Sequence, residues 1–413
     1  MGQGAYRRSL TRLLASPTRP KLGLDRMRAL LALLGNPQAR LFAVHIAGTK
    51  GKGSTAALVE SVARAHGLST GLTTSPHLSC ARERIVLDGT MIDERAFVAL
   101  EHEVHAAALT LDDAPSFFER MVAMAFLAFA NRPVDLAVVE VGLGGRLDAT
   151  NALAPRACGI TRLGLDHTEH LGPTLEHIAR EKAGIFKPGV PALSVPQEPA
   201  AAAVLVEAAR AVGAPLSFVE VDAGLSVGLP GRHQQENASL ALALLKHAGV
   251  ALRADAVARG LSSVRWPGRW ERLPGDPPLI LDGAHNETSA RALVEVARTD
   301  PLLHGRPLFL ILGMSSGHDP AAFAAALAPL RPQGVAAVAS WSPRTHPASH
   351  VARACARVFG VCEEAPLELA LARARVAARA AGGVVLVTGS LFLVGELRQR
   401  LLGGPVDPAL PLF

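Results

Sequence analysis

The segment HIAGTKGKGST, residues 45–55, combines glycines, two lysines and hydroxyl side chains in a spacing typical of a phosphate-binding loop. Glycines let backbone N–H groups turn toward an anion, and a helix beginning near Ser54 adds its positive end. Lys52 would place a positive charge on the β- and γ-phosphates of a nucleotide, and the Ser54 hydroxyl could ligate Mg²⁺. Gly53 breaks the usual G-x-x-x-x-G-K-[ST] pattern, and a plain strand-to-helix turn is the alternative. Plain turns rarely need this whole set of residues, so the segment predicts phosphate binding.

A carboxylate and an imidazole follow two other apolar segments. Glu140 lies within the apolar run DLAVVEVGLGG, where a bare carboxylate is costly unless it is paired or bound to a metal. Asp166 and His167 end the segment ACGITRLGLDH. A Glu and a His near a phosphate loop predict a divalent cation site. The alternatives are that the Glu pairs with an arginine and that the His only fills space.

Lysine is scarce in this chain, with only six among the 42 Lys and Arg residues. Four of them, Lys50, Lys52, Lys182 and Lys187, fall in two short Gly-containing segments. Arginine cannot replace lysine where a compact, modifiable amine is required. From the residues alone, a surface ion pair between Lys182 and Glu181 or another neighbour remains the simpler interpretation.

Two segments of the second half carry charged and imidazole side chains next to turns. Arg269 follows a Pro-Gly turn in RWPGRWERL, and Asp282 and His285 follow an apolar run in LDGAHN. Such side chains would reach the phosphates of a nucleotide if two domains closed around it. A domain-interface ion pair explains the same spacing equally well.

These residues all follow apolar runs that alternate with helical patterns. Strand-like runs at 41–48 and 135–145 and a short one at 157–167 are separated by helical patterns at 54–67, 94–109 and 117–130. Such alternation predicts a doubly wound, mostly parallel α/β sheet, whose ligands lie at the carboxyl ends of its strands.

The length of 413 residues predicts two domains. A Pro- and Gly-rich segment at 265–278 precedes a second series of strand, helix, strand and strand patterns, at 279–286, 287–299, 308–317 and 383–390. We therefore place the junction near Ser263–Gly268, with an N-terminal domain at 1–265 and a smaller, Rossmann-like α/β domain at 266–413. The crevice between them is the expected ligand site.

Composition excludes several classes of protein. The formal charge of +6 is spread along the chain without a basic block, so we expect no nucleic-acid partner. The longest apolar run, Met121–Ala130, is too short to cross a bilayer, and we expect it to be a buried helix. The N-terminus has no signal-peptide core and suits a surface helix. Four scattered cysteines argue against a disulfide framework and a zinc site and fit a cytosolic protein.

The ordered motifs resemble the folylpolyglutamate synthase/dihydrofolate synthase branch of the Mur ligase superfamily. That branch carries G-T-x-G-K-G-[ST], so the late Ser54 is the family's own form. The resemblance also covers TTSPHL (73–78), SFFE (116–119), EVGLGGRLDATN (140–151), LDHTEHLG (165–172), REKAGIFKPG (180–189), ENASLALALL (236–245), PGRW (267–270) and DGAHN (282–286).

The resemblance implies an ATP-dependent amide ligase with a P-loop-type N-terminal domain. It would add L-glutamate to dihydropteroate, to folates or to both, through an acyl phosphate, and release ADP and phosphate. Two Mg²⁺ ions and Lys52 would neutralise the charge between the two anions that react. Relatives suggest a monomer, with small-molecule substrates only and no membrane partner.

Site roles follow from matching positions. Ser54 and Glu140 resemble ligands of Mg²⁺, with Glu140 and His167 on a second ion that a carbamylated Lys182 would help to hold; Lys52, His167 and Lys182 would be catalytic. The implied nucleotide-binding residues are Gly48, Thr49, Gly51, Lys52, Gly53, Ser54, Thr55, Asn237 on the adenine side, Arg269, Asp282 and His285. The implied pterin or folate residues are Ser75, Pro76, His77, Phe117, Phe118 and Asp148.

The chain departs from the family pattern at three places. Lys50 stands where Asn is frequent, Glu287 stands where Pro is frequent, and residues 313–320 (GMSSGHDP) lack the usual D-K-D ending. Three alternatives stay open: a single-activity folylpolyglutamate synthase, a peptidoglycan Mur ligase and a non-catalytic nucleotide switch. The Mur ligase is disfavoured, since only about 40 residues precede the first strand, which leaves little room for a further domain.

Overall fold

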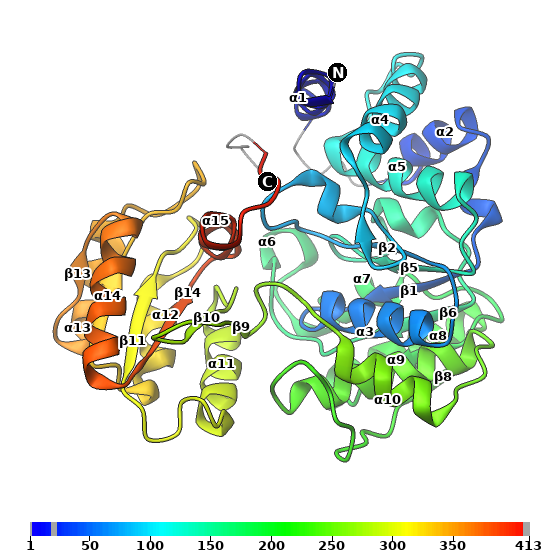
Figure 1. The fold of residues 1–413 in the computed structure, drawn as a ribbon. Coiled ribbons are helices and arrows are strands. Elements are labelled where there is room, and N and C mark those ends of the chain that lie inside the picture. Colours follow the sequence, from blue (N-terminus) through cyan, green and yellow to red (C-terminus); the bar gives the residue numbers. More distant parts are fainter. Residues whose placement is uncertain (1, 18–22, 408–413) are drawn as a thin grey trace.

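The computed structural model describes residues 2–17 and 23–407, which form two lobes, each built on one sheet (Figure 1). The first sheet has eight strands in the order β4-β3-β2-β5-β1-β6-β7-β8. The strands are β1 (Ala43–Ala47), β2 (Thr70–Thr73), β3 (Val86–Leu87), β4 (Thr90–Met91), β5 (Leu136–Glu140), β6 (Ala157–Ile160), β7 (Ala192–Ser194) and β8 (Leu216–Phe218). All neighbouring pairs are parallel except β2 with β3 and β3 with β4.

Helices cover both faces of this sheet. They are α1 (Gly2–Leu14), α2 (Asp25–Leu33), α3 (Lys52–Ala65), α4 (Glu94–Ala108), α5 (Phe117–Asn131), α6 (Thr168–Leu171), α7 (Leu175–Ala183), α8 (Pro199–Val212), α9 (His233–His247) and α10 (Ala254–Ser263), with short 3-10 turns at Pro37–Arg40, Ala81–Arg84 and Ala149–Ala152. Successive β1 side chains point to opposite faces, so Val44 and Ile46 pack with α3, α9 and α10. Ala43 packs on the other face with α5, which confirms a doubly wound sheet.

The second lobe has six strands in the order β13-β12-β11-β14-β10-β9. They are β9 (Glu271–Leu273), β10 (Leu279–Leu281), β11 (Leu308–Leu312), β12 (Gly334–Ala337), β13 (Glu363–Glu364) and β14 (Val384–Thr388), and only β9 is antiparallel to its neighbour. The helices are α11 (Glu287–Thr299), α12 (Pro320–Leu327), α13 (Ala348–Phe359), α14 (Leu367–Ala381) and α15 (Leu391–Leu402), with a 3-10 turn at Ala328–Leu330. Residues of α11, α12 and α13 share one core with the sheet, and residues of α14 and α15 share the other.

The sequence expectations hold for fold class and for most elements. The predicted helix at 287–299 is α11, and the predicted buried helix at Met121–Ala130 lies within α5 with all of its residues buried. Helix α3 begins at Lys52, two residues earlier than expected. The N-terminal helix is only partly on the surface, because Tyr6, Leu10 and Leu13 are buried. No helix in residues 2–17 or 23–407 is long and apolar enough to span a bilayer.

Candidate active site

The three motif-bearing strands of the first lobe are neighbours at the centre of the sheet. Strand β1 pairs in parallel with β5 on one side and with β6 on the other, with Ile46 opposite Glu140 and Ala47 opposite Ile160. Their carboxyl ends therefore lie at one edge. That edge carries the glycine loop after β1, Glu140 at the end of β5, and residues 161–167 after β6.

Glycines of the loop allow contacts that a side chain would block. Gly51 has φ +91°, and a Cβ there would collide with Oδ1 of Asn237 on α9. A Cβ on Gly48 would collide with the Thr161 hydroxyl, and one on Gly53 would lie 3.0 Å from the Trp266 ring. The loop therefore packs tightly on the segment after β6 and on α9, and the N-terminus of α3 faces the edge of the sheet.

We expect Gly51→Ala to weaken nucleotide binding at least tenfold, because the new methyl group must displace either the loop or Asn237. Left-handed backbone strain alone costs about 1–2 kcal/mol for a non-glycine residue. Gly67→Ala is the matched control: its φ is +86°, yet nothing lies within 4 Å of its Cβ. Titration with an ATP analogue distinguishes the two effects. Equal weakening in both variants would show that strain, and not the contact with Asn237, disturbs the loop.

The backbone of residues 49 and 50 is already engaged by the segment after β6. Both N–H groups donate to the Arg162 carbonyl, at 3.1 and 3.0 Å, and Thr49 Oγ1 donates to the Gly164 carbonyl at 3.1 Å. The N–H groups that remain for an anion are therefore those of residues 51–54, at the start of α3. This contact fixes the loop before any ligand binds.

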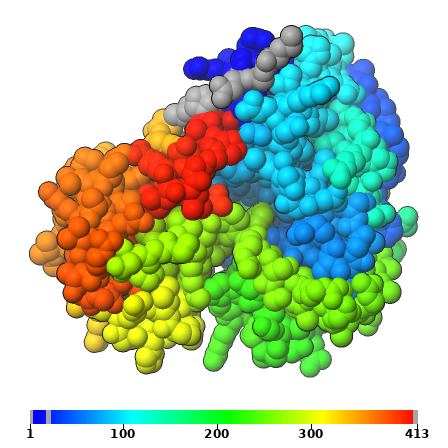
Figure 2. Space-filling view, in the orientation of Figure 1, coloured from blue at the N-terminus to red at the C-terminus, as the bar shows by residue number. Residues whose placement is uncertain are grey.

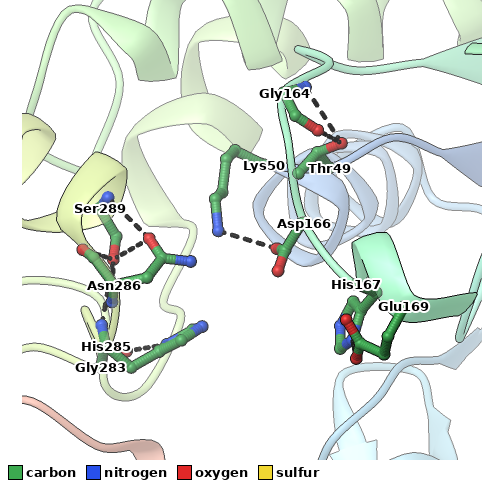
Figure 3. Close-up of polar contacts among 10 residues, drawn as sticks. All are labelled: Thr49, Lys50, Gly164, Asp166, His167, Glu169, Gly283, His285, Asn286 and Ser289. Carbon is green, nitrogen blue, oxygen red and sulfur yellow. Dashed lines mark hydrogen bonds and ion pairs between the residues drawn. The ribbon is translucent and has the colours of Figure 1, made fainter. Parts of the chain in front are cut away.

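The Lys50 side chain crosses the space between the lobes. Its Nζ lies 3.1 Å from Oδ2 of Asp166, and Figure 3 shows it between Asp166 of the first lobe and the His285–Asn286 segment of the second. Burial lowers the pKa of Lys50, while Asp166 opposes that shift and the positive charge of Lys52 adds to it. This departure from the family pattern thus adds a cation beside the loop.

Glu140 is buried at the end of β5, with 6% of its surface exposed. Its Oε2 accepts a hydrogen bond from the Ser75 backbone N–H at 3.0 Å. Burial raises its pKa, although Lys52, Arg269 and Arg84 all favour its charged form. Glu140 forms no direct ion pair with an arginine within residues 2–17 and 23–407, which was the alternative interpretation. Glu140 is therefore a carboxylate held in a positively charged surrounding.

Lys182 on α7 is 4% exposed. Its pKa is lowered to about 7, first by burial and then by the neighbouring charge of Lys52. The alternative of a surface ion pair with Glu181 is wrong, since Glu181 instead lies 2.7 Å from the Arg146 guanidinium. A buried lysine with a lowered pKa presents a neutral, nucleophilic amine near neutral pH.

His167 directly precedes helix α6 and has a left-handed conformation, with φ 50° and ψ 41°. Burial lowers its pKa, Asp166 and Glu169 oppose that shift, and Lys52 and Lys182 reinforce it. Its side chain lies near that of Glu169 and away from Lys50 (Figure 3). The neutral imidazole favoured by this surrounding is the form that binds metals.

A small cavity lies directly beside Glu140, between the end of β2 and helix α5. It is lined by Thr73, Thr74, Ser75, Arg84, Phe118, Met121, Val122, Glu140 and Thr150. Of the six residues predicted for the pterin side, Ser75 and Phe118 line it. Arg84, Met121 and Val122 were not predicted, and nothing in the run ARERI indicates that its second arginine is buried.

The other four predicted pterin residues lie around this cavity without lining it. His77 is buried and its Nδ1 accepts from Arg84 Nε at 3.0 Å, while the Arg84 guanidinium also stacks over the Phe117 ring. Pro76 is exposed and follows a cis peptide bond. Asp148 accepts from the backbone N–H groups of Leu143 and Thr150, at 2.8 and 3.0 Å, so its carboxylate holds the local chain.

Of the residues predicted in the second lobe, Arg269 and His285 lie within electrostatic reach of Glu140 and Lys50 of the first lobe, respectively, whereas Asp282 is bound within its own lobe. Asp282 accepts from the N–H groups of Trp270 and Ala284, at 2.9 and 2.8 Å, which fixes the loop after β10. Burial and the Lys50 charge lower the pKa of His285 to about 3, so its ring is neutral. Arg269 makes no ion pair among residues 2–17 and 23–407, which leaves its charge available to a ligand.

The side chains at the carboxyl edge of the first sheet offer oxygen donors for Mg²⁺, but no single group of the described residues completes a site. In the described part of the chain, no three side chains of the types His, Cys, Asp and Glu converge on one point. Glu140 and the Ser54 hydroxyl are both buried at the edge of the sheet, and oxygen donors of this kind are those that Mg²⁺ prefers. A carbamate on Lys182, which lies within electrostatic reach of Lys52, would add an anionic oxygen, so the donor types present suit Mg²⁺ when this lysine is modified.

Two domain models match the chain: the Mur ligase middle domain over residues 46–195 and the Mur ligase glutamate ligase domain over residues 268–391. The fold and the site thus define a two-domain Mur-type ligase. A crystal structure of a bifunctional folylpolyglutamate synthase/dihydrofolate synthase from Yersinia pestis, complexed with AMPPNP and Mn ion, superposes with a TM-score of 0.85 at 30% identity, covering 96% of this chain and 98% of that one.

Curated relatives narrow the class further. The chain is 36% identical over 311 residues to the dihydrofolate synthase/folylpolyglutamate synthase of Bacillus subtilis, covering 67% of this chain and 72% of the relative. It is 38% identical over 413 residues to a probable bifunctional folylpolyglutamate synthase/dihydropteroate synthase of Halobacterium salinarum, with 92% of this chain and half (50%) of that relative covered. The chain belongs to the folylpolyglutamate synthase/dihydrofolate synthase family of ATP-dependent ligases, which confirms the sequence resemblance.

Proposed function

We propose that this protein joins L-glutamate to dihydropteroate and to folates, with ATP converted to ADP and phosphate. The observation that carries the proposal is that Lys52 of the glycine loop lies within electrostatic reach of both buried Glu140 and buried Lys182. Arg269 of the second lobe also acts on Glu140, which lines a small cavity. Two carboxylate-bearing substrates and a triphosphate would bring many negative charges together. The lysines and arginines converging on this crevice match that requirement.

In the first half-reaction, an oxygen of the acceptor carboxylate attacks the γ-phosphorus of ATP, and the bond to the β–γ bridging oxygen breaks. Lys52 and the N–H groups of residues 51–54 hold the phosphates in line and offset the charge on the leaving ADP. Arg269 approaches from the second lobe. The product is an acyl phosphate, a carboxyl group activated for attack by an amine.

In the second half-reaction, the α-amine of glutamate attacks the carbonyl carbon of the acyl phosphate. The carbon–oxygen bond to phosphate breaks, the amide forms, and the amine loses its proton. Closure of the lobes excludes water, which would otherwise hydrolyse the acyl phosphate. The neutral His285 and the flanking segment 313–320 lie on the lobe that would deliver glutamate.

Two Mg²⁺ ions would supply positive charge to the phosphates, one held by Ser54 and Glu140 and the second by Glu140, His167 and carbamylated Lys182. For the chain itself, the lowered pKa of Lys182 supports modification, since only the neutral amine reacts with CO₂. Carbamylation forms a nitrogen–carbon bond and releases one proton. Glu140, held by the Ser75 N–H, keeps one oxygen directed by the backbone.

A coupled ADP-release assay with the purified protein tests the function. We expect turnover with dihydropteroate plus glutamate and with tetrahydrofolate plus glutamate, each dependent on Mg²⁺. Turnover with tetrahydrofolate plus glutamate but none with dihydropteroate plus glutamate would leave the single-activity folylpolyglutamate synthase as the correct assignment. Absence of ADP release with either acceptor would falsify the proposal.

A further inference from the structure

Residues 74–84 form an arch that joins the acceptor-side cavity to the second lobe. Both ends of the arch line the cavity, through Thr74 and Ser75 at one end and Arg84 at the other. Ser75 also donates its N–H to Glu140. The position of the arch therefore sets the shape of the cavity and the orientation of the buried carboxylate.

The top of the arch touches helix α15 of the second lobe. Ser79 Oγ donates to the Gly395 carbonyl at 3.2 Å, and the Gly395 Cα lies so close to the Leu78 carbonyl that a Cβ would not fit. In Figure 2 this C-terminal part of the chain, in red, lies against the blue and cyan surface of the first lobe. Contact between the lobes thus falls on the arch itself.

Asp407, five residues beyond the end of α15, adds a buried carboxylate to this contact, with only 6% of its surface exposed. Its Oδ2 accepts from the Ala81 N–H at 2.6 Å, and its Oδ1 accepts from the Tyr6 hydroxyl at 2.6 Å. Its own N–H donates to the Ser79 carbonyl at 3.0 Å. All of these partners belong to the first lobe, and two of the three to the arch.

We propose that Asp407 is a positioning residue for the acceptor site, which fixes the arch and helix α1 against the second lobe. This inference rests on the proposed function, because the cavity under the arch is taken as part of the acceptor side: Ser75 and Phe118, two of the residues predicted for the pterin, line it. A buried carboxylate is costly unless its oxygens are hydrogen-bonded, and both are satisfied here by groups of the other lobe. The carboxylate therefore ties the segment after α15 to the arch and to helix α1, and the packing within each lobe does not by itself require this link.

The arch keeps its internal shape without Asp407. Glu83 accepts from the N–H groups of Leu78, Ser79 and Cys80, at 2.6, 2.9 and 3.0 Å. Loss of Asp407 should therefore displace an intact arch and leave the fold of the lobe in place. The nucleotide loop at residues 48–54 shares no hydrogen bond with Asp407.

The test compares Asp407→Ala with Asp407→Asn in the full-length protein. For Asp407→Ala we expect the KM for dihydropteroate or tetrahydrofolate to rise about tenfold, as expected for loss of a charged hydrogen bond, with the KM for ATP unchanged. Asp407→Asn keeps an acceptor and a donor in place and should restore most of the affinity. Arg12→Met is the matched control, since it removes a tie between α1 and Glu101 on α4 without touching the arch.

Hydrogen exchange gives a readout that does not depend on activity. In Asp407→Ala, the amide of Ala81 should exchange faster, while amides of α3 keep their protection. If the wild-type protein is active and Asp407→Ala changes neither the KM for the acceptor nor the exchange of Ala81, this inference is overturned and the proposed function stands. If the KM values for the acceptor and for ATP rise equally in Asp407→Ala, or if Arg12→Met raises the KM for the acceptor to the same extent, the effect is a general loss of stability. Either result would also overturn the inference about Asp407. An inactive wild-type protein would instead contradict the proposed function.

Discussion

Replacing Lys182 with alanine should lower kcat at least a hundredfold and leave nucleotide binding largely unchanged. The residue is buried beside Lys52, and its pKa of about 7 leaves roughly half of the amine neutral at pH 7, compared with a negligible fraction for an ordinary lysine. A neutral amine is the form that takes up CO₂. Loss of Lys182 would remove the anionic oxygen of its carbamate from a site where the other side-chain donors do not complete a metal shell.

Steady-state kinetics and titration with an ATP analogue separate the two effects in Lys182→Ala. Short carboxylates such as formate or acetate should restore part of the rate, because they can occupy the space of the missing carbamate. Lys187→Ala is the matched control: this lysine lies in the same motif, but its amine contacts Asn151 Oδ1 at 2.7 Å. Full activity in Lys182→Ala would remove this residue from the mechanism, whereas a loss that no carboxylate restores would argue against a carbamate.

The sequence was sufficient for those parts of the site in which a local pattern determines the position of a residue. Strand-then-glycine patterns placed Gly51 and Glu140 at strand ends, and a parallel sheet brings such ends together. Helix α11 was predicted at its observed boundaries from its apolar spacing, and in the structure the Asn286 side chain caps its start.

Burial and long-range contacts could not be predicted in the same way. Lys182 sits in a polar-looking helix, and only the packing of α7 against the sheet shows that its amine is enclosed. Arg84 is buried through contacts with His77 and Phe117, but it lies outside every motif that the sequence offered. Asp407 acquires partners more than 300 residues away, which no local spacing could reveal.

Glu140→Gln should lower kcat at least a hundredfold without lowering the stability of the protein. The change keeps the size of the side chain but removes the negative charge that faces Lys52, Arg84 and Arg269. Burial raises the pKa of Glu140 above its value in the unfolded chain, so the unfolded state binds fewer protons and the ionised carboxylate opposes folding at neutral pH. Removing the charge relieves that cost while it weakens the metal site.

Glu101→Gln should behave in the opposite way and is the matched control. Glu101 is also fully buried in the first lobe, but it lies 3.1 Å from the Arg120 guanidinium and pairs with Arg12, far from the glycine loop. Breaking a buried ion pair costs about 3–5 kcal/mol, so Glu101→Gln should unfold at a lower temperature yet keep its kcat while folded. Thermal unfolding and kcat measured on both variants check the pair of predictions. A Glu140→Gln protein that loses stability but retains turnover would show that this carboxylate serves the fold and not the reaction.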